Sequence, residues 1–209
     1  MGSIDKNLFY VKFCGMVTVG KVDRQARRLP GEEGTWVFLF GDMTVFAVLF
    51  GTYLYYRGAE PVLFDGSQAR LNPTFGVANT LILLSSSLLV VTAVRAVRQR
   101  ENVLAGRLIV GAMVCGALFV VNKGVEYAQK ISQGFLPASD QFFMYFYGMT
   151  GLHLVHVVLG IGLLWFMLTL TRRSELTEWQ NSYLDGAACF WHMVDLLWII
   201  IFPLLYLVK

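Results

Sequence analysis

Five long apolar runs limit what this chain can fold into more than any motif does. A helix needs about 20 mostly apolar residues to cross the hydrocarbon core of a bilayer, and five windows of the 209-residue chain reach that length. Backbone polar groups inside hydrocarbon must be paired within the segment, so each run predicts a helix. The fourth run is longer than a bilayer requires, which indicates tilt or projection from the membrane. The predicted spans cover residues 36–56, 74–94, 108–127, 142–170 and 187–208.

Composition narrows the class of protein further. Hydrophobic residues make up 56% of the chain and charged residues only 15%, whereas soluble domains carry about 25% charged residues. This balance excludes a disordered chain and argues against an ordinary soluble enzyme. The formal net charge of only +3 argues against a nucleic-acid binder. The three cysteines are far apart and predict neither a disulfide framework nor a zinc motif.

The chain reads as one domain with a defined orientation. No repeat or linker interrupts the apolar runs, so we expect an all-α bundle of five transmembrane helices over residues 31–209, preceded by a tail at residues 1–30. The tail and the two connections on its side of the membrane hold 12 Lys and Arg residues, and the opposite side holds 5. Because short basic loops stay in the cytoplasm, we expect a cytoplasmic N-terminus and an outward-facing C-terminus.

Few ionisable residues lie inside the predicted spans, and each costs about 2.5–3.5 kcal/mol at a helix centre on insertion scales. Asp42 lies in the first span. Glu126 lies near the end of the third, where the i, i+3 spacing lets it pair with Lys123. The other candidates form two pairs with the same spacing, which are His153 with His156 in the fourth span and His192 with Asp195 in the fifth.

The residues alone leave four interpretations of these polar groups open. The histidines and Asp195 have the spacing to supply ligands to a metal, or axial ligands to haem, in a stand-alone membrane protein. Carboxylates and histidines are also the usual parts of a proton or ion path, as in a small transporter. The third interpretation is contact with lipid head groups or a larger partner subunit. The fourth is hydrogen bonding between helices that fixes their register.

Two strings in the last two spans resemble a known family. They are Gly151-Leu152-His153-Leu154-Val155-His156 and Phe190-Trp191-His192-Met193-Val194-Asp195-Leu196-Leu197-Trp198. The chain is similar here to subunit III of the haem-copper cytochrome oxidases, and the string WHxVDxxW is the specific part. Glu126-Tyr127 matches the family's site after its third span, and the helix from Gly34 to Met43 matches the one with the family's intramembrane Glu. The resemblance covers roughly residues 32–208.

The resemblance implies a non-catalytic subunit of a respiratory complex in a bacterial cytoplasmic membrane. We therefore expect no catalytic residue and no metal or other cofactor in this chain, with haem and copper held by partner subunits. The expected partners are the large catalytic subunit, other oxidase subunits and membrane phospholipid, and the expected roles are assembly, lipid binding and proton uptake. The candidate contact or proton-collecting residues are Asp42, Glu126, His153, His156, Trp191, His192 and Asp195.

Three features depart from the longer family members. Those members have seven spans, and this chain resembles a short form with five. Asp42 stands where the family has Glu, and its shorter side chain reaches less far. The opening from Pro30 to Trp36 and the pair Gly41-Asp42 resemble the branch associated with nitric oxide reductases, so an accessory subunit of such a reductase is the alternative.

Overall fold

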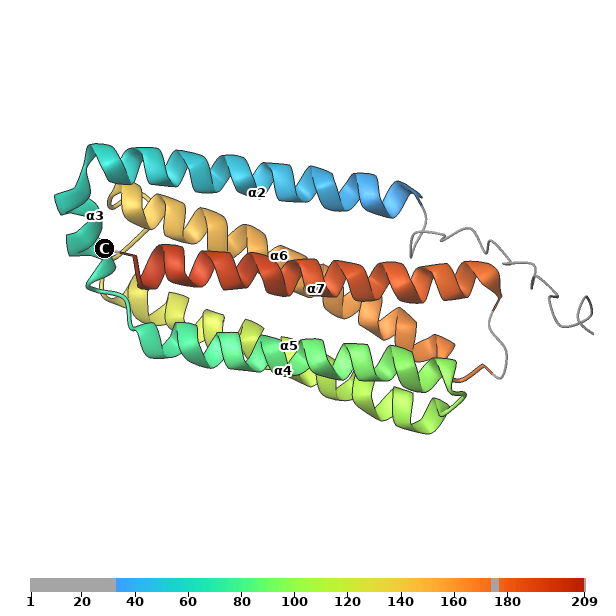
Figure 1. Ribbon diagram of the computed structural model, residues 1–209. Coiled ribbons are helices and arrows are strands. Elements are labelled where there is room, and N and C mark those ends of the chain that lie inside the picture. The colour runs from blue at the N-terminus through green and yellow to red at the C-terminus, as the bar shows by residue number, and fades with distance from the viewer. Residues whose placement is uncertain (1–32, 174–176, 209) are drawn as a thin grey trace, which may run out of the picture.

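The computed structural model describes residues 33–173 and 177–208, and these form one bundle of helices (Figure 1). Five helices of 26 to 31 residues are long and apolar enough to span a membrane, which confirms the five predicted spans. At 1.5 Å per residue each is about 40 Å long. The predicted tail at residues 1–30 lies outside the described residues. The long helices are α2 (Glu33–Ala59), α4 (Pro73–Arg98), α5 (Asn102–Ser132), α6 (Gln141–Leu170) and α7 (Glu178–Tyr206).

Each long helix begins before its predicted apolar window, and in α4, α6 and α7 a side-chain cap fixes the start. The largest difference is in α7, which begins at Glu178 rather than near residue 187. Thr177 and Gln180 form a capping box that holds the polar first turns in helical geometry. Similarly, the Asp140 side chain accepts a hydrogen bond of 2.8 Å from the backbone amide of Phe143 at the start of α6.

A short helix in the connection between the first two spans was not predicted. It is α3 (Pro61–Gln68), which closes one end of the bundle (Figure 1). Phe64 is fully buried there, and the Ser67 hydroxyl donates a hydrogen bond of 2.7 Å to the carboxylate of Asp140. Eight partly polar residues are too short to register as a span, so only the folded chain reveals this helix.

Helix α7 lies at the centre of the bundle and contacts α2, α4 and α6. Trp191 of α7 is fully buried, and it fills a slot between α5 and α6, each of which carries a glycine there. A Cβ at Gly116 of α5 would stand 2.9 Å from the Trp191 ring, and one at Gly160 of α6 would stand 2.7 Å from it. Neither glycine can gain a side chain without moving the tryptophan, so glycine at both positions sets the spacing of three helices.

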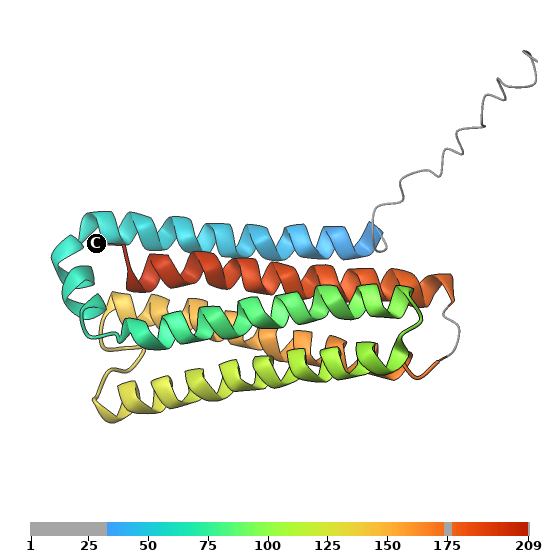
Figure 2. The same cartoon turned by 60° about the horizontal axis from the view of Figure 1, so that its bottom comes forward.

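Helix α2 is attached differently from the rest. It lies along one side of the bundle, away from α5 (Figures 1 and 2), and its contacts are with α3, α6 and α7. Only 17% of its most apolar window is buried, compared with 56% in α7. Leu39, Phe46 and Tyr53 recur every seven residues and form its buried stripe. Trp36, Leu49 and Phe50 are partly buried beside this stripe. Most other apolar side chains of α2 are exposed, towards lipid or another protein.

Candidate functional site

The polar residues predicted from the sequence do not form a single site. The structure distributes them over four places in the bundle, and two of these contain an acid facing a potential cation. We call Lys123, Glu126 and Tyr206 the buried cluster, and Asp42 with His156 the edge pair. The other two places hold His153 alone and the group around His192.

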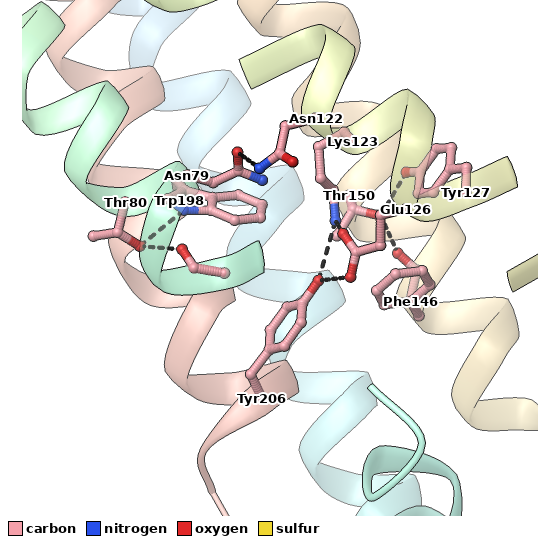
Figure 3. Close-up of polar contacts among 11 residues, drawn as sticks. Asn79, Thr80, Asn122, Lys123, Glu126, Tyr127, Phe146, Thr150, Trp198 and Tyr206 are labelled. Atoms are coloured by element: carbon pink, nitrogen blue, oxygen red, sulfur yellow. Dashed lines mark hydrogen bonds and ion pairs between the residues drawn. The ribbon is translucent and has the colours of Figure 1, made fainter. Parts of the chain in front are cut away.

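The buried cluster joins α5 to α7 through a closed set of hydrogen bonds (Figure 3). The ammonium of Lys123 lies 2.7 Å from Oε2 of Glu126, which confirms the pairing expected from their spacing. The Tyr206 hydroxyl donates to the Glu126 Oε1 atom at 2.7 Å and accepts from Lys123 at 3.2 Å. The Lys123 and Glu126 side chains are only 0% and 2% exposed. Both carboxylate oxygens are therefore paired without water.

Aromatic rings complete the surroundings of the Lys123 ammonium. Its Nζ atom lies 4.9 Å from the ring centroid of Phe146 and 5.2 Å from that of Trp198. The rings of Tyr127 and Tyr206 are at 5.5 and 5.7 Å. The negative faces of aromatic rings attract a cation, and more strongly where water is excluded. These contacts offset part of the cost of burying the charge.

Neutral hydrogen bonds between helices surround the buried cluster, and sequence reasoning missed all of them. The only available signal was the presence of two amide side chains, Asn79 and Asn122, inside otherwise apolar runs. Such groups need a partner in hydrocarbon, and here they find one on a neighbouring helix (Figure 3). The pairs are Asn122–Asn79 at 2.6 Å, Tyr127–Thr150 at 2.6 Å and Trp198–Thr80 at 3.1 Å.

The edge pair joins α2 to α6. The Oδ2 atom of Asp42 lies 3.2 Å from Nε2 of His156, and the two side chains are 19% and 9% exposed. The Nδ1 atom of His156 lies 2.8 Å from the Leu152 carbonyl oxygen, which can only accept, so Nδ1 carries a hydrogen. Nε2 and Asp42 therefore need one further proton between them to make a favourable contact, on the imidazole or on the carboxyl.

His153 lies one turn from His156 but in different surroundings. It is fully buried, with ring centroids 5.5 Å from Phe119 and 5.3 Å from Trp198. Neither of its ring nitrogens has a hydrogen-bond partner among the described residues. The HxxH spacing therefore places one histidine against α2 and the other against α5 and α7.

The third span-embedded histidine belongs to a serine-rich contact between α4 and α7. The Nδ1 atom of His192 lies 2.6 Å from the Ser87 hydroxyl, and Ser87 is also the polar neighbour of the buried Asp195. The indole nitrogen of Trp191 donates to the Ser86 hydroxyl at 3.0 Å. Trp191 and His192 thus hold α7 against α4. Within the described ranges, no three His, Cys, Asp or Glu side chains gather as a metal site would require.

An apolar cavity of about 500 Å³ lies close to the edge pair, between α2, α6 and α7. Phe38, Leu163 and Phe190 are among its lining residues, and the Phe190 ring stacks on His156 at 6.2 Å between centroids. Pockets of roughly 300–1,000 Å³ accept small molecules. A mostly apolar wall suits a hydrocarbon chain.

Comparison with known proteins assigns the family. The family described as cytochrome c oxidase subunit III matches residues 32–209, which include all five long helices. The chain is 34% identical over 180 residues to "Cytochrome c oxidase subunit 3" of Thermostichus vulcanus, covering 83% of this chain and 85% of that protein. It is 29% identical over 176 residues to "Probable cytochrome c oxidase subunit 3" of Nocardia farcinica, covering 84% and 87%. It is also 26% identical over 174 residues to "Cytochrome bo(3) ubiquinol oxidase subunit 3" of Buchnera aphidicola, covering 83% and 84%. The chain belongs to the cytochrome c oxidase subunit III family.

Proposed function

We propose that this chain is the non-catalytic subunit III of a haem-copper oxidase complex in aerobic electron transport. It sits beside a large catalytic subunit that holds the haem and copper. The observation that carries the proposal is the family match over the whole described bundle. The use of the polar residues supports it, since most of them hold helices of this chain together. Of the candidate residues, Asp42 and His156 lie between α2 and α6 and do not belong to the buried cluster.

In this role the exposed apolar side of α2 is the face that meets the catalytic subunit or its surrounding lipid. The edge pair lies on that side, where a carboxylate faces an imidazole at 3.2 Å. Such a pair is suited to take up and release protons near a partner's proton entrance. The adjacent cavity is suited to an acyl chain of a bound phospholipid. We therefore assign assembly, lipid retention and support of proton uptake to this one surface.

The parent complex reduces oxygen in this proposal rather than nitric oxide. The names of the relatives refer to cytochrome c and ubiquinol oxidases, which supports an oxidase. The nitric oxide reductase alternative depends on the stretch from Pro30 to Trp36 and on Asp42. The membrane is the bacterial cytoplasmic one, with the N-terminus inside, because basic residues favour that side.

Affinity purification tests the proposal. The full chain carries a tag, is expressed at its native level and is extracted in a mild detergent. We expect a large haem-bearing subunit to copurify, with an absorption spectrum that belongs to that partner and with oxygen consumption but no nitric oxide consumption. Recovery of a monodisperse, haem-free chain without partners contradicts the proposal. A Soret band that stays with the isolated chain contradicts the non-catalytic role and supports a stand-alone haem protein.

A further inference from the structure

A second groove, on a different pair of helices, carries charge that the bundle does not use. It lies between the start of α5 and the end of α6, at the opposite end of the bundle from α3, and encloses about 540 Å³. Its walls combine apolar side chains with two guanidinium groups. The lining residues are Asn102, Val103, Gly106, Arg107, Val110, Leu168, Thr171 and Arg172.

The two lining arginines have no partner in the described part of the chain. Arg107 and Arg172 are exposed, and neither takes part in a hydrogen bond or ion pair there. Arg98, at the same end of the bundle, pairs with Asp185 at 2.6 Å. Residues 100–107 and 171–173 together hold four arginines and one glutamate. Among the residues that the structure describes, the mouth of the groove therefore carries uncompensated positive charge.

Gly106 lies on the floor of the groove. A Cβ there would make ordinary contacts with Oγ1 of Thr171 at 3.5 Å and Cδ1 of Leu168 at 3.7 Å, so a larger side chain would occupy the groove beside these atoms. A hydrogen bond of 3.2 Å from the Asn102 side chain to the Arg173 carbonyl holds the two sides of the groove together. The groove is thus a fixed feature between two helix ends.

We propose that this groove binds an anionic phospholipid, with its phosphate between Arg107 and Arg172 and an acyl chain along Val103, Val110 and Leu168. The charge of the groove and its expected depth in the membrane both favour this occupant. Both helices end here, so the mouth lies at the level of the lipid head groups while the apolar floor extends into the hydrocarbon. Basic pockets between transmembrane helices bind anionic head groups. The site is separate from the α2–α6–α7 cavity and does not depend on which complex the chain joins.

Lipid titration of the full-length chain, followed by native mass spectrometry, tests the site. The probes are phosphatidylglycerol and phosphatidylcholine with identical acyl chains. We expect Arg107→Gln and Arg172→Gln each to weaken phosphatidylglycerol binding about fivefold, and the double variant about 25-fold. Arg173→Gln removes an adjacent arginine that does not line the groove, and we expect a change of less than about twofold. We expect phosphatidylcholine binding to stay unchanged in the variants at all three arginine positions.

A second variant tests the apolar half of the site. Gly106→Leu fills the floor while both arginines remain, so we expect it to remove phosphatidylglycerol binding. In a separate competition experiment, we expect that millimolar inorganic phosphate does not displace the lipid from the wild-type chain. Equal binding of the two lipids by the wild-type chain overturns the proposal. Unchanged phosphatidylglycerol binding in the double arginine variant also overturns the proposal. The same holds if that variant keeps its phosphatidylglycerol binding but loses a copurifying protein subunit. Displacement by phosphate alone also overturns it.

Discussion

Two carboxylates of this bundle each face a nitrogen base, and the difference between them separates structure from function. Glu126 lies in the buried cluster, where both of its oxygens have partners and four aromatic rings surround the paired ammonium. Asp42 lies in the edge pair, where its one close partner is a histidine and its side chain is 19% exposed. Neither oxygen of the Glu126 carboxylate is left unpaired for another molecule. The second carboxylate, that of Asp42, faces a single histidine at 3.2 Å, and its side chain stays partly exposed.

The same contrast extends to the helices that carry them. Helices α4 to α7 form an interior in which a tryptophan fills the space left by two glycines. Helix α2 has one buried stripe and otherwise meets the membrane or a partner. A paired polar group in the closed interior, such as Glu126, therefore holds helices of this chain together, whereas Asp42 under α2 lies nearer to the surroundings. Substitutions at the two sites should therefore change different measured quantities.

Breaking the buried cluster should have the largest effect on stability. We expect Glu126→Gln or Lys123→Met to lower the free energy of unfolding by about 3–5 kcal/mol, because each leaves an uncompensated buried group. The double variant Lys123→Met/Glu126→Leu should recover at least half of that loss, since an apolar pair of similar volume replaces the ion pair. Denaturant unfolding of the purified chain in detergent measures both. A loss in the double variant equal to the sum of the two single losses would show that the charges are not coupled.

Overfilling the tryptophan slot should have the next largest effect. Gly160→Ala places a Cβ 2.7 Å from Trp191 and should cost about 1–3 kcal/mol of stability. Gly162→Ala, on the same helix with nothing within 4 Å of its Cβ, is the matched control. It should stabilise α6 by up to about 1 kcal/mol, because alanine favours a helix more than glycine does. Similar stabilities of the two variants, by the same unfolding measurement, would contradict the closed interior.

Asp42→Asn should have a small effect on stability and a clear effect on the complex. The amide can still donate a hydrogen bond to Nε2 of His156, so we expect a loss of about 0.6 kcal/mol or less. The variant cannot exchange a proton, however, and the complex should lose activity faster during turnover at unchanged haem content. Time courses of oxygen consumption and haem spectra measure this. Asp42→Glu, which keeps a carboxylate on a side chain that is one methylene longer, is the control and should retain the wild-type lifetime.

An exposed ion pair at the end of the bundle should have a similarly small effect on stability. Arg98 and Asp185 lie 2.6 Å apart with side chains 66% and 24% exposed. Water and salt screen such a pair, so Arg98→Gln should cost less than about 1 kcal/mol. The cost should shrink further at high ionic strength. A loss as large as that of the Lys123 variants would undo the ranking of these sites by burial.

The sequence predicts those parts of this structure that depend on neighbouring residues. Hydropathy finds the five spans, and the i, i+3 spacing finds the pair of Lys123 and Glu126. The capping box at Thr177 is also readable in principle, although an apolar window starts α7 too late. These features depend only on the period of the helix and on local chemistry.

Contacts between distant helices could not be predicted, because they depend on how each helix is rotated and spaced. The pairing of Asp42 with His156 crosses from the first long helix to the fourth. Tyr206 completes the buried cluster from 80 residues beyond Glu126. The spacing of His153 and His156 suggests a shared site, but the i, i+3 step leaves enough rotation for them to meet different helices. Nothing in the local sequence carries that information.

The most direct test of the central claim is the haem content of the complex before and after this chain is removed. A stronger detergent strips the chain from the purified complex, and the haem per catalytic subunit is measured in both fractions. We predict that all of the haem stays with the catalytic subunit while the lifetime of turnover becomes shorter. Haem that leaves with this chain, or a lifetime that does not change, would contradict its assignment as a non-catalytic supporting subunit.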